Sequence, residues 1–122
     1  LFIPIKNKKY SKEHMILISL IYQLKGALSI NDIKSSLETI NDSLLNDYSF
    51  ELITLYKNYL DLTESNVESF KQDVNNRVTE VNEISYLEDT KLEKFLLLTS
   101  FVTMSNIYRR LAEQLVDDLK ES

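Results

Sequence analysis

Residues 10–37, YSKEHMILISLIYQLKGALSINDIKSSL, contain two short helical patterns in succession. In the first pattern, Ser11 stands in an N-cap position and Gly26 acts as a stop signal. The apolar residues between them recur at helical spacing: Met15, Ile18, Ile21 and Leu24. We therefore expect a helix over residues 12–25.

The second pattern begins at Ser29, with Asp32 three residues later in the capping-box position. Its apolar stripe is formed by Ile30, Ile33, Leu37 and Ile40. We expect a helix over residues 30–40, after which residues 41–43 cap a further short turn through Leu44 and Leu45. Two amphipathic helices joined so tightly must fold back on each other to bury their stripes.

The composition predicts an all-α fold. The 122 residues include one glycine and one proline, far below the usual frequencies of about 7% and 5%. A sheet protein needs many tight turns, and this chain lacks their usual residues. We expect a single domain over residues 1–122 with four to six helices: an N-terminal arm and two-helix module over residues 1–40, and a helical bundle with long C-terminal helices over residues 41–122.

The helical period resumes after an expected break at residues 46–49. A narrow apolar seam follows, typical of a coiled coil or a two-helix hairpin: Ile53, Tyr56, Leu60, Val67, Phe70, Val74, Val78, Val81 and Ile84. Because Thr63 can act as a cap, the pattern leaves open whether residues 50–84 form one helix or two.

The last expected helix is capped by Asp89 and runs from residue 90 to about residue 119, after a connector at residues 85–88. Its middle, residues 95–104, is apolar nearly all round. Such a helix is either central in the fold or covered by a partner, and we favour a homodimer.

No residue pattern indicates catalysis, a metal or a cofactor, so we do not expect an enzyme. The chain has no cysteine, and its one histidine, His14, is expected on the surface or packed against the arm. Carboxylate pairs such as Glu80 with Glu83 are interpreted as solvated helix faces. The tyrosines and phenylalanines could line a ligand pocket, but an ordinary helical core explains them equally well: Tyr48, Tyr56, Tyr59, Tyr86, Tyr108, Phe50, Phe70, Phe95 and Phe101.

The charge is unevenly distributed along the chain. Residues 1–34 carry +4, whereas residues 35–122 carry −9. The basic cluster Lys6, Lys8, Lys9 and Lys12 either contacts phosphate or forms a solvated loop. No apolar run approaches the roughly 20 residues of a membrane span, and no signal peptide is recognisable, so we expect a cytoplasmic protein without a membrane partner.

The N-terminal third resembles the MerR-type transcription regulators. The resemblance covers about residues 1–38 and rests on LFIP at residues 1–4, the basic tip, YSKEHM at residues 10–15 and LSINDIK at residues 28–34. In that family a helix-turn-helix is followed by a leucine–apolar–proline strand and a basic segment called the wing, which ends in Tyr-Tyr-Ser. The whole chain looks closer still to an uncharacterised MerR-like family of Gram-positive bacteria.

The resemblance implies that the wing contacts the DNA backbone through Lys6, Lys8, Lys9 and Tyr10. It also implies that dimerisation and effector binding belong to the later helices. The chain departs from the family at the wing, where Lys6, Asn7 and Lys8 stand in place of Gly-Tyr-Arg. It also begins with Leu, where the recognition helix should already have ended, so we expect a helix-turn-helix to be missing upstream.

The sequence therefore predicts a fragment of a transcription regulator, with DNA a partner of the full-length protein only, since nothing here can read base edges. A dimeric body would then set the spacing of two wings. A stand-alone helical adaptor whose first segment only mimics a wing is the alternative. No effector motif transfers from the family.

Overall fold

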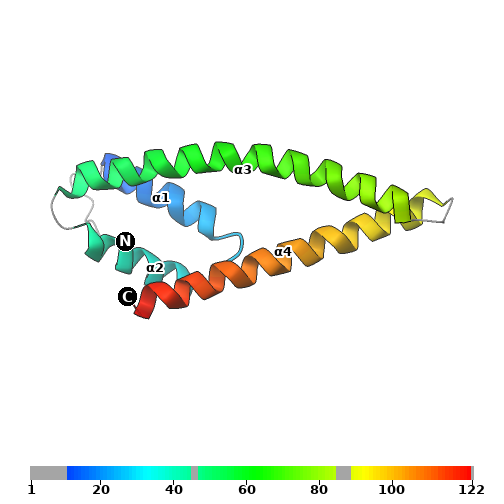
Figure 1. Ribbon diagram of the computed structural model, residues 1–122. Helices are drawn as coiled ribbons and strands as arrows, with labels where there is room; N and C mark the ends of the chain where they lie inside the picture. The colour runs from blue at the N-terminus through cyan, green and yellow to red at the C-terminus, as the bar shows by residue number, and fades with distance from the viewer. Residues whose placement is uncertain (1–10, 45–46, 85–88, 122) are drawn as a thin grey trace. The chain divides into compact units, whose positions relative to one another are not determined.

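The computed structural model describes residues 11–44, 47–84 and 89–121 (Figure 1). This part of the chain contains α-helices and no strand, which confirms the all-α prediction. The helices are α1 (Lys12–Leu24), α2 (Ile30–Ser43), α3 (Tyr48–Ile84) and α4 (Thr90–Glu121). The expected arm and the connector at residues 85–88 lie outside the described residues.

The chain divides into two compact units. The first unit combines Leu1–Tyr59 with Arg109–Ser122, and the second unit is Leu60–Tyr108. The first unit therefore contains α1, α2, the start of α3 and the end of α4. The second unit contains the remainder of α3 and α4. Across the described residues, no helix combines the length and the apolar content that a bilayer crossing requires.

Serine caps begin both short helices, as the sequence predicts. Ser11 Oγ accepts a hydrogen bond from the backbone N–H of His14 at 3.2 Å, and Ser29 Oγ accepts one from the N–H of Asp32 at 3.1 Å. The predicted end of α2 at residue 40 is wrong, because the helix continues to Ser43. There the Ser43 hydroxyl donates to the carbonyl oxygen of Thr39 at 3.0 Å, so this polar residue is accommodated within the helix rather than capping a new turn.

The question of one helix or two is resolved, because α3 is continuous over Tyr48–Ile84. It begins earlier than expected: Asp47 Oδ1 accepts a hydrogen bond from the N–H of Phe50 at 3.2 Å, and residues 48 and 49 form the first turn rather than a break. The Asp89 cap is confirmed, since its Oδ1 accepts from the N–H of Lys91 at 2.9 Å. α4 extends two residues beyond the expected end, to Glu121.

The core of the first unit forms where α1 packs on α3. Ile16 and Leu17 of α1 cluster with Leu52 of α3, which is fully buried. The predicted stripe of α1 is wrong in part, because Met15 is 62% and Ile18 is 39% exposed. The helix is apolar on several sides, so its periodicity could not choose the buried face; packing against Leu52 decides it.

The second unit has very little interior. Among its described residues, 60–84 and 89–108, Val81 is the one buried residue. The middle of α4 is open to solvent, with Phe95 59% and Leu98 55% exposed. The alternative of a central helix is therefore wrong, and cover by a partner stays a prediction.

Candidate functional site

The predicted DNA-contacting residues Lys6, Lys8, Lys9 and Tyr10 lie outside the described residues, so their role stays a prediction. The described residues begin at Ser11, which is the N-cap of α1. Three features of the described residues are candidates for function: the start of α1, the apolar surface of the second unit, and a pocket in the first unit.

The start of α1 is held by a reciprocal contact between Ser11 and His14. Besides accepting from the His14 backbone, Ser11 Oγ lies 2.5 Å from His14 Nδ1, and the Ser11 N–H donates to Nδ1 at 3.4 Å. His14 takes the place that Glu or Gln usually has in a capping box. Its side chain is 2% exposed, so the alternative that it lies on the surface is wrong, while packing against the arm involves residues outside the described part of the chain and stays a prediction. This contact fixes the start of α1.

A second polar contact ties α1 to α3. The Ser49 hydroxyl donates to the Glu13 carboxylate. This hydrogen bond is the largest of several interactions that hold the pKa of Glu13 below its ordinary value. Next to it, burial and then the negative charge of Glu13 raise the pKa of Tyr48. The N-terminal end of α1 is thus attached to α3 by both apolar and polar contacts.

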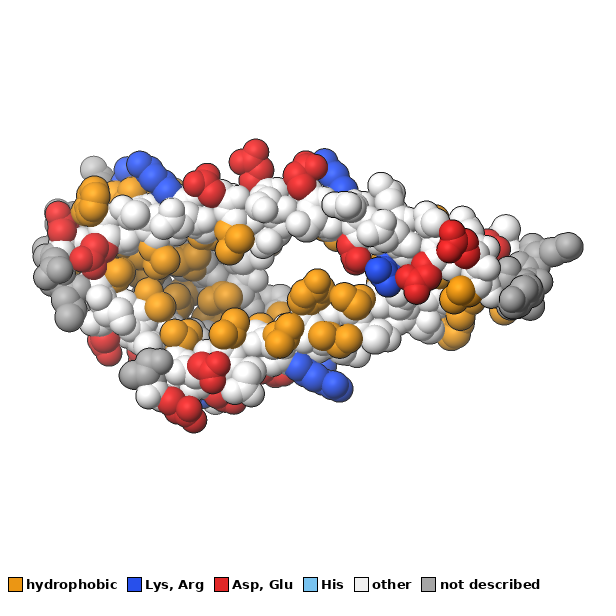
Figure 2. Space-filling view, viewed as in Figure 1, with side chains coloured by type: hydrophobic (Ala, Val, Ile, Leu, Met, Phe, Trp, Pro, Cys, Tyr) orange, Lys and Arg blue, Asp and Glu red, His pale blue; other side chains and the backbone are white. Residues whose placement is uncertain are grey.

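The second unit exposes a broad apolar surface on both of its helices. We call this set the unit-2 apolar surface: Leu60, Val67, Phe70, Val78, Ile84, Leu92, Phe95, Leu98, Phe101, Val102 and Ile107, each at least 37% exposed. Figure 2 shows apolar side chains gathered along α4. A patch of this kind on a single chain is a marker of protein–protein contact.

On α3 this surface follows part of the predicted seam, which has heptad spacing. Leu60, Val67, Val74 and Val81 are seven residues apart and so lie along one side of the helix. Charged residues beside the seam pair within the same helix: Arg77 contacts Glu80 at 2.9 Å and Asp73 at 3.5 Å. The ion pairs of Arg77 beside the seam are therefore formed within α3 itself.

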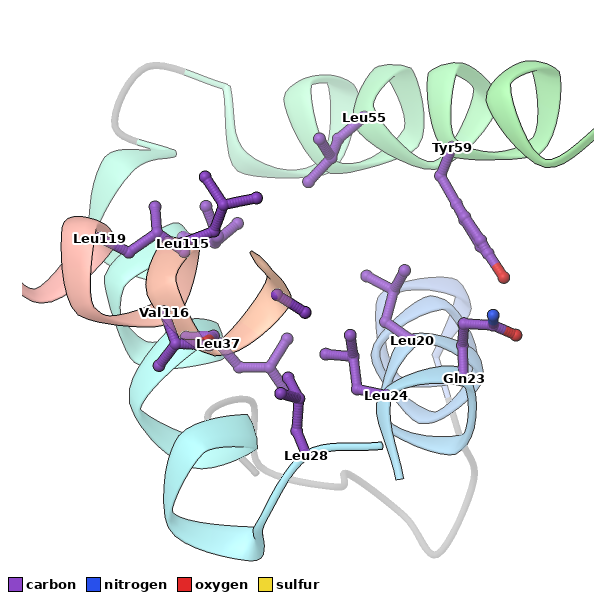
Figure 3. A pocket seen from close by; sticks show the side chains of 13 residues that line it. Leu20, Gln23, Leu24, Leu28, Leu37, Leu55, Tyr59, Leu115, Val116 and Leu119 are labelled. Carbon is purple, nitrogen blue, oxygen red and sulfur yellow. The ribbon is translucent and has the colours of Figure 1, made fainter. Parts of the chain in front are cut away.

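The first unit contains an apolar pocket of about 390 Å³. Its walls come from α1, α2, the start of α3 and the end of α4 (Figure 3). Of the aromatic residues considered from the sequence, Tyr59 alone lines it, so the pocket is aliphatic rather than aromatic. Leucines at four-residue spacing, Leu20, Leu24 and Leu28, gave a local signal for one wall. The contribution of α4, about 90 residues away in the chain, had no local signal.

The described residues include no group of three His, Asp or Glu side chains placed to hold a metal ion. Glu80, considered above as part of a carboxylate pair, instead accepts a charge-assisted hydrogen bond from Arg77.

A family described as a domain of unknown function (DUF1836) matches residues 1–59 of the chain. No curated protein matches the chain, and no solved structure matches it. The family match ends at Tyr59, which is also where the N-terminal segment of the first unit ends. The chain is therefore similar to this family over the lysine-rich segment (residues 1–12), α1, α2 and the first turns of α3.

Proposed function

We propose that the chain is the wing and helical dimerisation part of a MerR-like transcription regulator. Two copies associate through the unit-2 apolar surface, and each contributes one lysine-rich segment to a DNA backbone. The observation that carries the proposal is the combination of a wide exposed apolar surface with a second unit that has almost no interior of its own.

The dimer is supported first by the amount of apolar surface left uncovered. Covering a large apolar side chain contributes on the order of 1.5–3 kcal/mol relative to leaving it in water. In the described part of the second unit one residue, Val81, is buried by the chain itself. A segment of this size with so small a core gains stability mainly by association.

The pattern along α3 also favours a pair of helices. Three of the four seam positions at seven-residue spacing are valine, in Val67, Val74 and Val81. β-Branched residues at one heptad position are typical of two-stranded coiled coils. Because Val81 is already buried within the chain, self-pairing uses the exposed positions of the seam, Leu60 and Val67, extended by the apolar face of α4.

The charge distribution supports the assignment of DNA contact to the N-terminal segment. Residues 60–108 carry nine acidic and four basic side chains, which repel phosphate. The segment of residues 1–12 carries four lysines and no acid. Each such lysine adds attraction to phosphate that does not depend on base sequence.

Sedimentation equilibrium tests the dimer. The chain is expected to be a dimer, and the double variant Val67→Asp/Phe70→Asp is expected to be a monomer at the same concentration. Leu62→Asp is the matched control, because Leu62 is 62% exposed on the same helix but lies outside the seam. A wild-type chain that stays monomeric at high concentration contradicts the proposal and leaves the adaptor alternative.

Fluorescence anisotropy with labelled duplex DNA at low salt tests the lysine-rich segment. We expect weak binding that is insensitive to base sequence and that falls as salt rises. The triple substitution Lys6→Gln/Lys8→Gln/Lys9→Gln is expected to abolish it, whereas Lys71→Gln/Lys91→Gln/Lys94→Gln, in the second unit, is expected to leave it unchanged. Equal losses from the two triple variants would assign the DNA contact elsewhere.

A further inference from the structure

The pocket in the first unit is large enough to hold a small molecule, and neither dimerisation nor DNA contact uses it. Figure 3 shows Leu24, Leu37, Leu55 and Leu115, one from each helix, around the same space. A cavity of about 150 Å³ in another protein binds benzene. At about 390 Å³ this pocket has room for a larger molecule and lies within the range of roughly 300–1,000 Å³ typical of ligand sites.

The lining restricts the chemistry of the occupant. Ten of the thirteen lining residues are aliphatic, and the other three are Gln23, Ser36 and Tyr59. None of the thirteen carries a charge. A charged ligand would lose its hydration here without gaining a charged partner, and water would find few hydrogen bonds. The body of the ligand is therefore uncharged and apolar.

Ser36 supplies a second, independent indication of a ligand. Its side chain lines the pocket and the residue is only 7% exposed. Among the described residues no atom forms a hydrogen bond with its Oγ. A serine within a helix can satisfy its hydroxyl on a carbonyl of the preceding turn, as Thr39 does on Ser35 at 3.0 Å, but Ser36 does not. A buried hydroxyl left unpaired is costly, and a ligand group in the pocket would satisfy it.

The walls of the pocket come from all four helices of one chain, as in the small-molecule sites that form between the helices of a bundle.

We propose that this pocket binds a small uncharged amphiphile. Its aliphatic body lies among the leucines of the four helices, and its single hydrogen-bonding group, such as a hydroxyl, pairs with Ser36 Oγ. The inference does not depend on dimerisation or on DNA contact.

The uncharged dye N-phenyl-1-naphthylamine, whose fluorescence rises in apolar sites, tests for occupancy. We expect the wild-type chain to enhance its emission and 1-octanol to displace it. Ala112→Phe places a ring in the pocket and is expected to abolish both effects. Ala27→Phe is the matched control, because Ala27 is exposed and is not a lining residue. Helical content measured by circular dichroism establishes that both variants are folded.

Ser36→Ala tests the hydrogen bond. We expect its affinity for 1-octanol to fall about three- to tenfold, the loss corresponding to one hydrogen bond, while its affinity for benzene is unchanged. Ser35→Ala, at the neighbouring position outside the lining, is expected to bind both competitors as the wild type does.

Three results would overturn the proposal. The first is the absence of any dye enhancement with the wild-type chain, which would mean that a segment of protein fills the pocket. The second is dye binding that survives Ala112→Phe, which would place the dye on the unit-2 apolar surface instead. The third is an equal loss of octanol and benzene affinity in Ser36→Ala, which would assign Ser36 a packing role only.

Discussion

The two units of this chain have similar apolar content but bury it to different extents. In the first unit, segments of all four helices contribute to an interior that includes Ile16, Leu17, Leu52 and the buried His14. In the described part of the second unit, Val81 alone is buried, although its helices carry many large apolar residues. The first unit thus buries part of its apolar surface within one chain, although Tyr22 and Ile30 stay exposed, whereas the described part of the second unit buries very little.

The two units also differ in which elements their polar contacts join. In the first unit they join separate elements: Ser49 of α3 donates to Glu13 of α1, and Lys120 Nζ of α4 lies 3.6 Å from Asp32 Oδ1 of α2. In the second unit the described ion pairs of Arg77 lie within α3. Exposed pairs of this kind stabilise a helix by only about 0.3–0.5 kcal/mol. The first unit therefore has polar contacts between separate helices, whereas the ion pairs of Arg77 in the second unit stabilise α3 alone.

The largest expected effect comes from removing side-chain volume in the first unit. Leu52→Ala is expected to lower the free energy of unfolding by about 2–5 kcal/mol, because Leu52 is fully buried and the surrounding helices cannot close the cavity completely. Leu62→Ala in the second unit is expected to change it by about 0.5 kcal/mol or less, since Leu62 is 62% exposed. Urea unfolding at a fixed protein concentration measures both values.

Comparable losses from the two substitutions would contradict the contrast between the units. They would mean that the side chain of Leu62 is covered in solution, and hence that association in the second unit involves more of α3 than the seam.

A smaller effect is expected at the start of α1. Ser11→Ala removes the hydrogen bond to the His14 backbone and the contact with the buried His14 ring, so we expect a loss of about 1–2 kcal/mol. Ser29→Ala removes a single exposed cap and is expected to cost about 0.5–1 kcal/mol. Urea unfolding of the two variants in parallel gives the difference, and equal losses would show that the His14 contact adds nothing to the cap.

Local signals in the sequence were sufficient for the class of fold and for the starts of three helices. The scarcity of glycine and proline predicted an all-α chain, and Ser11, Ser29 and Asp89 were read correctly as caps. Capping depends on atoms within three residues of one another, so it can be read without knowledge of the tertiary structure.

Tertiary properties were harder to predict. Among the described residues Leu52 is the least exposed, yet it is absent from the predicted seam, because α1 rather than a heptad partner packs on that face of α3. The pocket could not be predicted for a related reason. Leu37 and Val116 line the same space, but they lie far apart in the chain, and no local sequence pattern shows that they meet. Periodicity identifies an apolar face but not the element that will cover it.

The smallest effect we expect concerns pH and the contact between α1 and α3. Because Ser49 donates to the Glu13 carboxylate, the pKa of Glu13 in the folded chain lies below its ordinary value of 4.5. A carboxyl group whose pKa is lowered by folding stabilises the folded state above its unfolded pKa, and this contribution is lost as the pH falls through the lowered pKa. Ser49→Ala removes the largest cause of the shift. We therefore expect the difference in unfolding free energy between wild type and Ser49→Ala to be greatest near neutral pH and to shrink as the pH falls below about 4.

Urea unfolding across this pH range measures that difference, and the Glu13→Gln background is its control. With glutamine at position 13 there is no carboxyl group to titrate, so Ser49→Ala should have the same effect at every pH. Thr54→Ala, on the same helix, removes a hydroxyl that donates to the carbonyl oxygen of Phe50 at 2.9 Å and should likewise show no dependence on pH. A Ser49→Ala effect that stays constant from acid to neutral pH would mean that the hydroxyl stabilises the protonated and ionised forms of Glu13 equally. The attachment of α1 to α3 would then rest on the apolar contacts of Ile16, Leu17 and Leu52 alone.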